Sequence, residues 1–161
     1  MRKENVDVEN LSMFNNFFEL LNIKQSFEID QEDLYNHYIK LQSLLHPDKL
    51  NSKSRAEKII AIEAASKLNE AYYILKDDKK RAEYLLFLNN IIINQETDNN
   101  ISPDPMMLNE ILELSEDPDF KLISEKKDEC WNIFKENYSK NILNQAAQAI
   151  IKLQYLNKIH S

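Results

Sequence analysis

The tetrapeptide His46-Pro47-Asp48-Lys49 brings an imidazole, a proline ring, a carboxylate and an ammonium group together in four consecutive residues. A helical pattern precedes it, with apolar or aromatic side chains at Leu34, Tyr38, Leu41 and Leu45. Pro47 disfavours the α region at His46, so we expect that helix to end near His46. The tetrapeptide then lies in a loop stiffened by proline, where an imidazole and a carboxylate can recognise a partner. A capped turn at a helix end, without a role in binding, is the alternative interpretation.

A second helical run follows the tetrapeptide. Its apolar face consists of Ile60, Ala64, Leu68, Ala71 and Leu75. Asp30 is a suitable N-cap for the first run, and the two runs predict long helices at about 31–45 and 55–76 that pack antiparallel. Shorter helices are expected at about 13–21 and 79–89.

Three more helices are predicted after residue 100. Asp104 and Asp117 are each followed by proline, and both are suitable N-caps, as is Ser139. These caps mark helices that end near residues 116, 137 and 158. We expect the three to form an antiparallel bundle with short turns.

The complete absence of glycine from the 161 residues also favours helices. Glycine is used in tight β-hairpin turns and in loops that cradle phosphates. The expected fold is therefore all-α, without a nucleotide-binding loop. It consists of an antiparallel helical hairpin with short flanking helices at 1–93 and the three-helix bundle at 101–161, and the polar, aperiodic segment 94–100 is the expected linker.

Charge and hydropathy exclude several classes of protein. The net charge of −7 argues against nonspecific nucleic-acid binding, which needs clustered lysine and arginine. No stretch approaches the roughly 18 apolar residues of a membrane span, and the first residues lack the apolar core of a signal peptide. We therefore expect a cytoplasmic protein. Its single cysteine, Cys130, fits a reducing compartment and is expected to be a packed structural thiol.

A metalloenzyme or cluster carrier is one rival interpretation. Its ligands would come from His37, His46, Asp48, Cys130 and His160. The spacing speaks against it, because His37 and His46 are nine residues apart and would lie on opposite sides of a continuing helix. The sequence also contains no Cys-x-x-Cys or His-Glu-x-x-His pattern. We expect neither a metal site nor a cofactor.

The first helix of the bundle has two faces that differ in character. Met107, Ile111 and Leu114 form one apolar face, which is expected to pack into the bundle. The opposite face carries Leu108, Asn109, Leu112, Glu113 and Glu116. An apolar strip rimmed by carboxylates is a reasonable binding surface, although packing against the N-terminal domain would explain it equally well.

The order of these elements resembles the J-domain. The first long helix is followed by His46-Pro47-Asp48 and a loop. The second long helix then carries Leu68-Asn69-Glu70-Ala71-Tyr72, and Asp77-Asp78-Lys79-Lys80-Arg81 opens a short last helix. Within this family, residues 81–86 and the region after residue 100 are similar to HscB, the J-type co-chaperone of iron–sulfur cluster assembly. The resemblance extends over nearly the full chain from Met13.

For the N-terminal domain, the resemblance implies binding to a DnaK-class ATPase chaperone of the HscA type. It implies that Asp48 reaches an arginine of the chaperone, while His46 and Pro47 hold the orientation of Asp48. Lys49 occupies the family's usual fourth position. Lys40 lies on the helix face that J-domains use to meet an acidic chaperone surface, although this face is less basic than in many of them.

For the bundle, the resemblance implies binding to an IscU-like iron–sulfur scaffold protein. Leu108, Leu112, Glu113 and Glu116 would form the contact surface with Tyr155 on the last helix, while Asn109 stands at a position that is usually apolar in the family. The chain would then perform no chemistry itself and would activate the ATPase of its partner. A J-domain co-chaperone with a different client, or one whose bundle serves dimerisation, is the remaining alternative.

Overall fold

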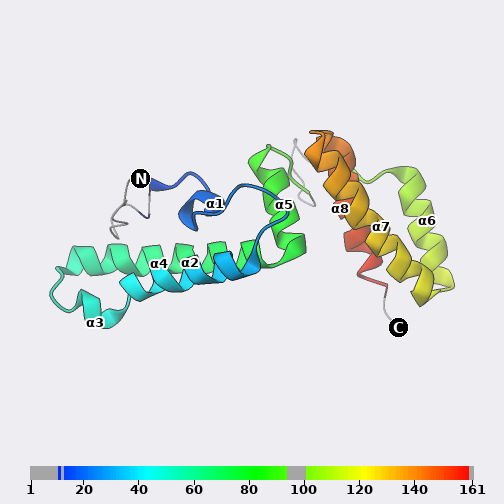
Figure 1. Ribbon diagram of the computed structural model, residues 1–161. Helices are drawn as coiled ribbons and strands as arrows, with labels where there is room; N and C mark the ends of the chain where they lie inside the picture. The colour runs from blue at the N-terminus through cyan, green and yellow to red at the C-terminus, as the bar shows by residue number, and fades with distance from the viewer. Residues whose placement is uncertain (1–10, 12, 94–100, 160–161) are drawn as a thin grey trace. The chain divides into compact units, whose positions relative to one another are not determined.

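The computed structural model describes residues 11, 13–93 and 101–159, and the elements in these ranges are helices (Figure 1). The predicted all-α fold is confirmed. The chain divides into two compact units, residues 1–81 and 82–161. The expected linker at 94–100 lies outside the described residues, so the predicted domain limits stay a prediction. None of the helices in the described ranges is long and apolar enough to cross a membrane.

The first unit is built on a pair of long helices. Figure 1 shows α2 (Gln31–Leu44) and α4 (Arg55–Lys76) side by side, with the short α3 (Pro47–Leu50) between them at the turn. Helix α1 (Phe17–Leu20) packs against α4. It is shorter than the predicted helix at 13–21, because Asn16 caps it by accepting a hydrogen bond from the Glu19 N–H at 2.9 Å.

Apolar side chains on the facing sides of α2 and α4 form the core of the hairpin. The buried residues are Leu34 and Leu41 on α2, Leu45 just after it, and Ala61, Ala64, Leu68, Ala71 and Leu75 on α4. The prediction for Ile60 is wrong, because this side chain is exposed and Ala61 is buried instead. The residues from Ala61 onward are spaced by three or four, so the buried stripe follows the helical period from Ala61.

Tyrosine 38 adds a polar and aromatic link between the two long helices. Its ring stacks on Tyr72 with centroids 4.1 Å apart, and its hydroxyl donates to the Asn69 side chain at 2.8 Å. Gln42 donates to the same hydroxyl at 2.9 Å. Burial raises the pKa of Tyr38, and the neighbouring Tyr73 and Tyr72 add to this effect. These contacts fix the register of α2 along α4.

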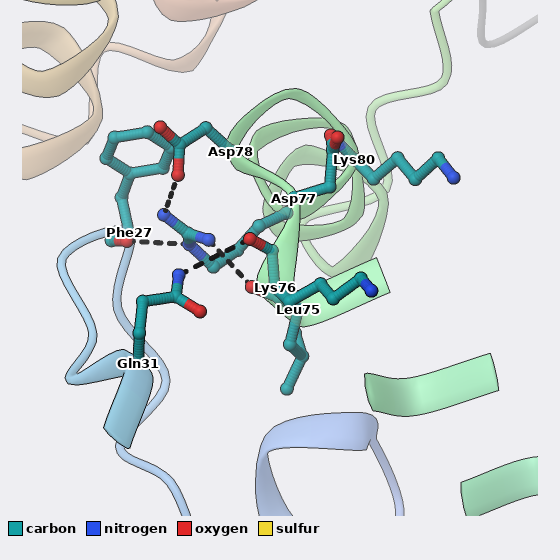
Figure 2. Close-up of polar contacts among 8 residues, drawn as sticks. Phe27, Gln31, Leu75, Lys76, Asp77, Asp78 and Lys80 are labelled. Carbon is teal, nitrogen blue, oxygen red and sulfur yellow. Dashed lines mark hydrogen bonds and ion pairs between the residues drawn. The ribbon is translucent and has the colours of Figure 1, made fainter. Parts of the chain in front are cut away.

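A buried arginine fastens the opposite end of the hairpin. The Arg81 side chain is only 4% exposed, donates to the Phe27 and Leu75 carbonyls at 2.7 and 2.6 Å, and donates to the Asp78 carboxylate at 2.7 Å. Figure 2 shows Phe27, Leu75 and Asp78 converging from a loop, the end of α4 and the start of α5 (Asp78–Leu88). Gln31 donates to the Lys76 carbonyl at 3.3 Å in the same view. Arg81 therefore ties three chain segments together.

The second unit contains three helices after residue 100, as predicted. They are α6 (Pro105–Glu116), α7 (Phe120–Ser139) and α8 (Leu143–Leu156). Helices α7 and α8 form the most extensive pair, and α6 packs on α8. The core is centred on α8, which contributes seven buried residues, whereas α6 contributes three.

Two of the three predicted N-caps in this unit are wrong. Asp104 caps α6 as expected, but α7 is capped by Asp119, which accepts from the N–H groups of Lys121 and Leu122 at 3.0 Å each. Asp117 instead ends α6, because Pro118 favours extended backbone before it.

Ser139 is the last residue of α7 and not the cap of α8. Its hydroxyl donates to the Glu136 carbonyl at 2.8 Å, inside its own helix. Asn141 then adopts a positive φ of 59°, which turns the chain toward α8. Helix α8 begins at Leu143 after Ile142, without a side-chain cap.

We predict that Arg81→Met lowers the free energy of unfolding by about 3 kcal/mol, because it leaves two buried carbonyls without their charged donor. Urea denaturation followed by circular dichroism measures this change. Arg55→Met removes an exposed arginine at the start of α4 and is the matched control, with an expected change within about 0.5 kcal/mol. Equal effects of the two substitutions would contradict the anchoring role of Arg81.

Candidate functional site

The His46-Pro47-Asp48 segment is a tightly capped turn and not an irregular loop. Pro47 is the first residue of α3, and His46 is its N-cap with extended backbone at φ −61° and ψ 137°. The Nδ1 atom of His46 accepts a hydrogen bond from the Asp48 N–H at 3.3 Å. The short helix was not expected, and it forms because proline is favoured at the first helical position. One turn therefore joins all three residues.

This turn presents the Asp48 carboxylate to solvent. The side chain of Asp48 is 85% exposed and that of His46 is 60% exposed. The His46 Nδ1 atom also lies 3.4 Å from the Asp48 Oδ2 atom, which would be an ion pair only with a protonated ring. A protonated Nδ1 has no lone pair for the Asp48 N–H, so the capping hydrogen bond requires the neutral ring. In this arrangement His46 orients Asp48 through its backbone.

An apolar groove of about 460 Å³ lies beside the turn, between α2 and α4. It is lined by Ile39, Gln42, Ser43, Leu45, His46, Pro47, Ala65, Leu68 and Asn69. The sequence did not indicate this groove, because its walls come from two helices separated along the chain. His46 and Pro47 are among its lining residues, so the turn borders the groove directly.

Few positive charges lie near this surface. Lys40 is exposed on α2, one turn before Ser43 of the groove, and Lys49 is exposed within α3. Lys53 approaches Glu57 at 3.8 Å, which partly cancels its charge. The structure therefore agrees with a weakly basic surface.

The second predicted site, the strip on α6, is exposed as expected. Leu108 is 37% and Leu112 is 59% exposed, whereas Met107, Ile111 and Leu114 are buried. Asn109, Glu113 and Glu116 are also exposed on α6. We call Leu108, Asn109, Leu112, Glu113 and Glu116 the α6 strip. The binding role of the α6 strip stays a prediction.

Polar contacts fix how α6 lies on α8. Gln148 of α8 accepts from the Asp104 N–H at 3.0 Å and donates to the Ser102 carbonyl at 2.7 Å, at the start of α6. One turn later on α8, Lys152 donates to Glu110 at 2.6 Å, in the middle of α6. Because the contacts advance in the same direction along both helices, α6 and α8 run parallel.

This parallel arrangement places the remaining predicted residue. Tyr155 is half-buried on α8, with the Lys158 Nζ atom 5.3 Å from its ring centroid. It lies almost one turn beyond Lys152 and is therefore level with the last part of α6, where Glu113 and Glu116 lie. The inclusion of Tyr155 in one surface with the α6 strip stays a prediction.

The sequence analysis missed the position of Glu110. Its carboxylate accepts hydrogen bonds from Lys126 of α7 and Lys152 of α8. Burial alone would raise the pKa of Glu110, but the hydrogen bonds from the two lysines outweigh it and lower this pKa. The lysines are 16 and 42 residues away from Glu110, so no local pattern could have indicated the cluster.

The residues of the rival metal site are used in other ways. Cys130 is buried, and this burial raises the pKa of its thiol to about 11, in agreement with the packed structural thiol that was predicted. His37 contacts the Leu21 carbonyl at 2.8 Å through Nδ1, while His46 caps α3. His160 lies outside the described residues. Within the described ranges, no group of three or more His, Cys, Asp or Glu side chains could hold a metal ion.

The hairpin with a His-Pro-Asp turn has the architecture of a J-domain, and the family model of the DnaJ domain matches residues 16–84. Solved structures extend the likeness to the second unit. The crystal structure of human co-chaperone protein HscB has a TM-score of 0.77 at 26% identity and covers 90% of this chain and 78% of its own. Chaperone HscB from Vibrio cholerae has a TM-score of 0.71 at 31% identity, with coverages of 89% and 92%.

Curated sequences give the same result. The co-chaperone protein HscB homolog of Aliivibrio salmonicida is 29% identical over 160 residues, which cover 90% of this chain and 92% of that relative. The HscB homolog of Vibrio cholerae serotype O1 (strain M66-2) is 38% identical over 102 residues, 63% of this chain. That match spans 58% of the relative's length. The chain belongs to the HscB co-chaperone family.

We predict that the two faces of α6 respond differently to truncation. Leu114→Ala should lower the free energy of unfolding by about 2–4 kcal/mol, because it opens a cavity beneath α6. Leu112→Ala should change it by less than about 0.5 kcal/mol, because Leu112 faces solvent. Thermal and urea unfolding of the full chain measure both. A large cost for Leu112→Ala would mean that this side chain is buried, and the α6 strip would not be a free surface.

Proposed function

We propose that this chain is a J-type co-chaperone of iron–sulfur cluster assembly. It stimulates ATP hydrolysis by a DnaK-class chaperone of the HscA type and binds an IscU-like scaffold protein. The observation that supports the proposal is the presence of two exposed surfaces, one on each unit: the turn with its groove, and the α6 strip. The chain needs no chemistry of its own for this role.

At the first surface, the Asp48 carboxylate pairs with an arginine of the chaperone. A carboxylate that faces solvent can accept two hydrogen bonds from one guanidinium group, which fixes geometry as well as energy. The capping bond from the Asp48 N–H to His46 fixes the backbone from which this carboxylate projects. The groove adds apolar contact area next to the carboxylate, and Lys40 and Lys49 add positive charge at its margin.

Stimulation of the ATPase requires more than binding. A ligand that binds all conformations of the chaperone equally cannot shift their populations. The turn must therefore bind most tightly to the conformation that hydrolyses ATP. A single oriented carboxylate suits this task, because its partner arginine is in reach in one conformation and displaced in another.

At the second surface, the chemistry of the α6 strip selects the partner. Leu108 and Leu112 supply apolar area, while Glu113 and Glu116 make its margin acidic. Asp117 and Asp119 continue the acidic margin past the end of α6, where both are exposed. Such a surface suits a scaffold protein with an apolar patch bordered by lysine or arginine.

A chain that carries both surfaces raises the effective concentration of the scaffold at the chaperone. Delivery of the scaffold and stimulation of hydrolysis can then occur within one complex. A cytoplasmic location is part of the same proposal, because the buried Cys130 thiol suits a reducing compartment.

We predict that Asp48→Asn abolishes stimulation of the chaperone ATPase, because an amide keeps the size of the side chain but loses the charge that pairs with arginine. Steady-state ATP hydrolysis by the HscA-type chaperone of the same organism measures the effect. Asp33→Asn, in the first turn of α2, removes the same charge away from the turn and should keep stimulation. Full stimulation by folded Asp48→Asn protein would refute the assignment of Asp48.

We predict that the full chain binds the IscU-type scaffold of the same organism saturably in a calorimetric titration. Leu108→Ala/Leu112→Ala should weaken binding by at least about tenfold, because apolar anchors at the centre of an interface carry most of its energy. The control is Leu122→Ala/Ile133→Ala, which removes two similarly exposed side chains from α7, 39% and 37% exposed in the structure.

Three calorimetric outcomes and one in sedimentation are decisive for the scaffold. Loss of binding in the α6 variant alone supports cluster delivery. Equal loss in both variants would mean that the α6 strip is not the specific contact. Absence of binding by the folded wild-type chain would leave a J-domain co-chaperone with a different client, and a shift to dimer in sedimentation that depends on the α6 strip would indicate a dimerisation bundle.

A further inference from the structure

Glu110 connects all three helices that follow residue 100. Its Oε1 atom accepts a hydrogen bond from Lys126 of α7, and its Oε2 atom accepts one from Lys152 of α8 at 2.6 Å. The cluster is largely removed from solvent, since the three side chains are 32%, 21% and 20% exposed. Each carboxylate oxygen therefore holds a different helix.

Glu110 faces away from the two leucines of the α6 strip. It lies two residues from both Leu108 and Leu112, which places it roughly 160° from each of them around the helix axis, whereas Glu113 lies only about 60° from it. Glu110 flanks the buried face, next to Leu114. Both of its carboxylate oxygens are engaged by lysines of α7 and α8, so Glu110 contacts its own bundle from the side opposite the leucines.

The apolar attachment of α6 is narrow. Only three of its side chains are buried in the described structure, whereas α8 buries seven. Three buried side chains offer few ridges to pack into the grooves of neighbouring helices, so polar contacts contribute more to the rotation of α6 about its own axis. Gln148 holds the start of α6, but it bonds to the Ser102 carbonyl and the Asp104 N–H, which precede the helix.

We propose that Glu110 is a positioning residue, which fixes the rotation of α6 through Lys126 and Lys152 and so sets the direction in which the α6 strip faces. A rotation of α6 by one residue position would carry the carboxylate about 100° away and break both contacts. Its effect on scaffold binding rests on the proposed function, whereas its effect on α6 can be measured without any partner.

The two lysines explain why a carboxylate is required here. Without it, two half-buried ammonium groups would face each other with no negative charge between them, which is costly in a poorly solvated site. A glutamine at position 110 can accept from one lysine only, because its amide group presents donors to the other. An aspartate keeps the charge but is one methylene too short to reach both.

Amide hydrogen exchange on the full-length chain tests the proposal. In Glu110→Gln the amides of α6 should exchange about tenfold faster, while those in the centres of α7 and α8 stay within about twofold of wild type. Glu136→Gln is the matched control, because it removes a carboxylate that pairs with Lys140 on the exposed surface of α7 at 2.6 Å. It should leave the exchange of α6 unchanged.

Unchanged exchange of α6 in folded Glu110→Gln protein would overturn the proposal. Equal acceleration in α6, α7 and α8 would also overturn it, because that pattern shows a general loss of bundle stability. Glu110→Asp keeps the proposal testable if Glu110→Gln does not fold. It should accelerate amide exchange selectively in α6, although the net charge is preserved.

Calorimetry with the scaffold protein then connects positioning to binding. Glu110→Gln and Glu110→Asp should both weaken binding at least about threefold, because α6 pays an ordering cost on association. If Glu110→Gln weakened binding and Glu110→Asp did not, the effect would come from long-range electrostatics, and the positioning role would be overturned. If wild-type protein binds no scaffold, the proposed function fails, and the exchange experiment still decides the role of Glu110.

Discussion

The proline at position 47 is the constraint on which the first unit depends. Its ring disfavours the helical conformation at His46, so α2 cannot continue beyond its C-cap Leu45, and its fixed φ starts α3 immediately after His46. The chain reverses over residues 45–54, and α4 can return along α2. The same two effects leave His46 extended and place its imidazole at the Asp48 N–H. One backbone restriction therefore produces both the hairpin and the outward carboxylate.

The two proposed recognition surfaces are displayed by different physical means. At the turn, a short cycle of local contacts orients Asp48, and the packing of the distant hairpin end by Arg81 matters only for stability. On α6, the helix itself presents the α6 strip, so the direction of that surface depends on how α6 sits on its neighbours. Few apolar side chains hold α6, and the polar contacts of Gln148 and Glu110 therefore carry unusual weight.

Sequence periodicity predicted the helices well and their ends less well. Asp30 and Asp104 cap α2 and α6 as expected, because each aspartate reaches the N–H groups two and three residues later. Asp117 and Ser139 can also accept capping hydrogen bonds but serve other roles, since Asp119 caps α7 and Ser139 bonds inside its own helix. Ile60 also fits a helical period, yet the buried stripe begins at Ala61. A period identifies a face, while packing decides where that face starts.

The sequence by itself determined the helical class, the break at Pro47, the exposed character of Asp48 and the two-faced pattern of α6. All of these follow from local rules, namely backbone restriction and a period of 3.6 residues. Only the tertiary structure decided the groove between α2 and α4, the anchor at Arg81 and the meeting of Glu110 with Lys126 and Lys152. These features join residues far apart in the chain, up to 54 positions for Arg81 and Phe27. No local pattern encodes such a pairing, because it exists only after the helices have packed.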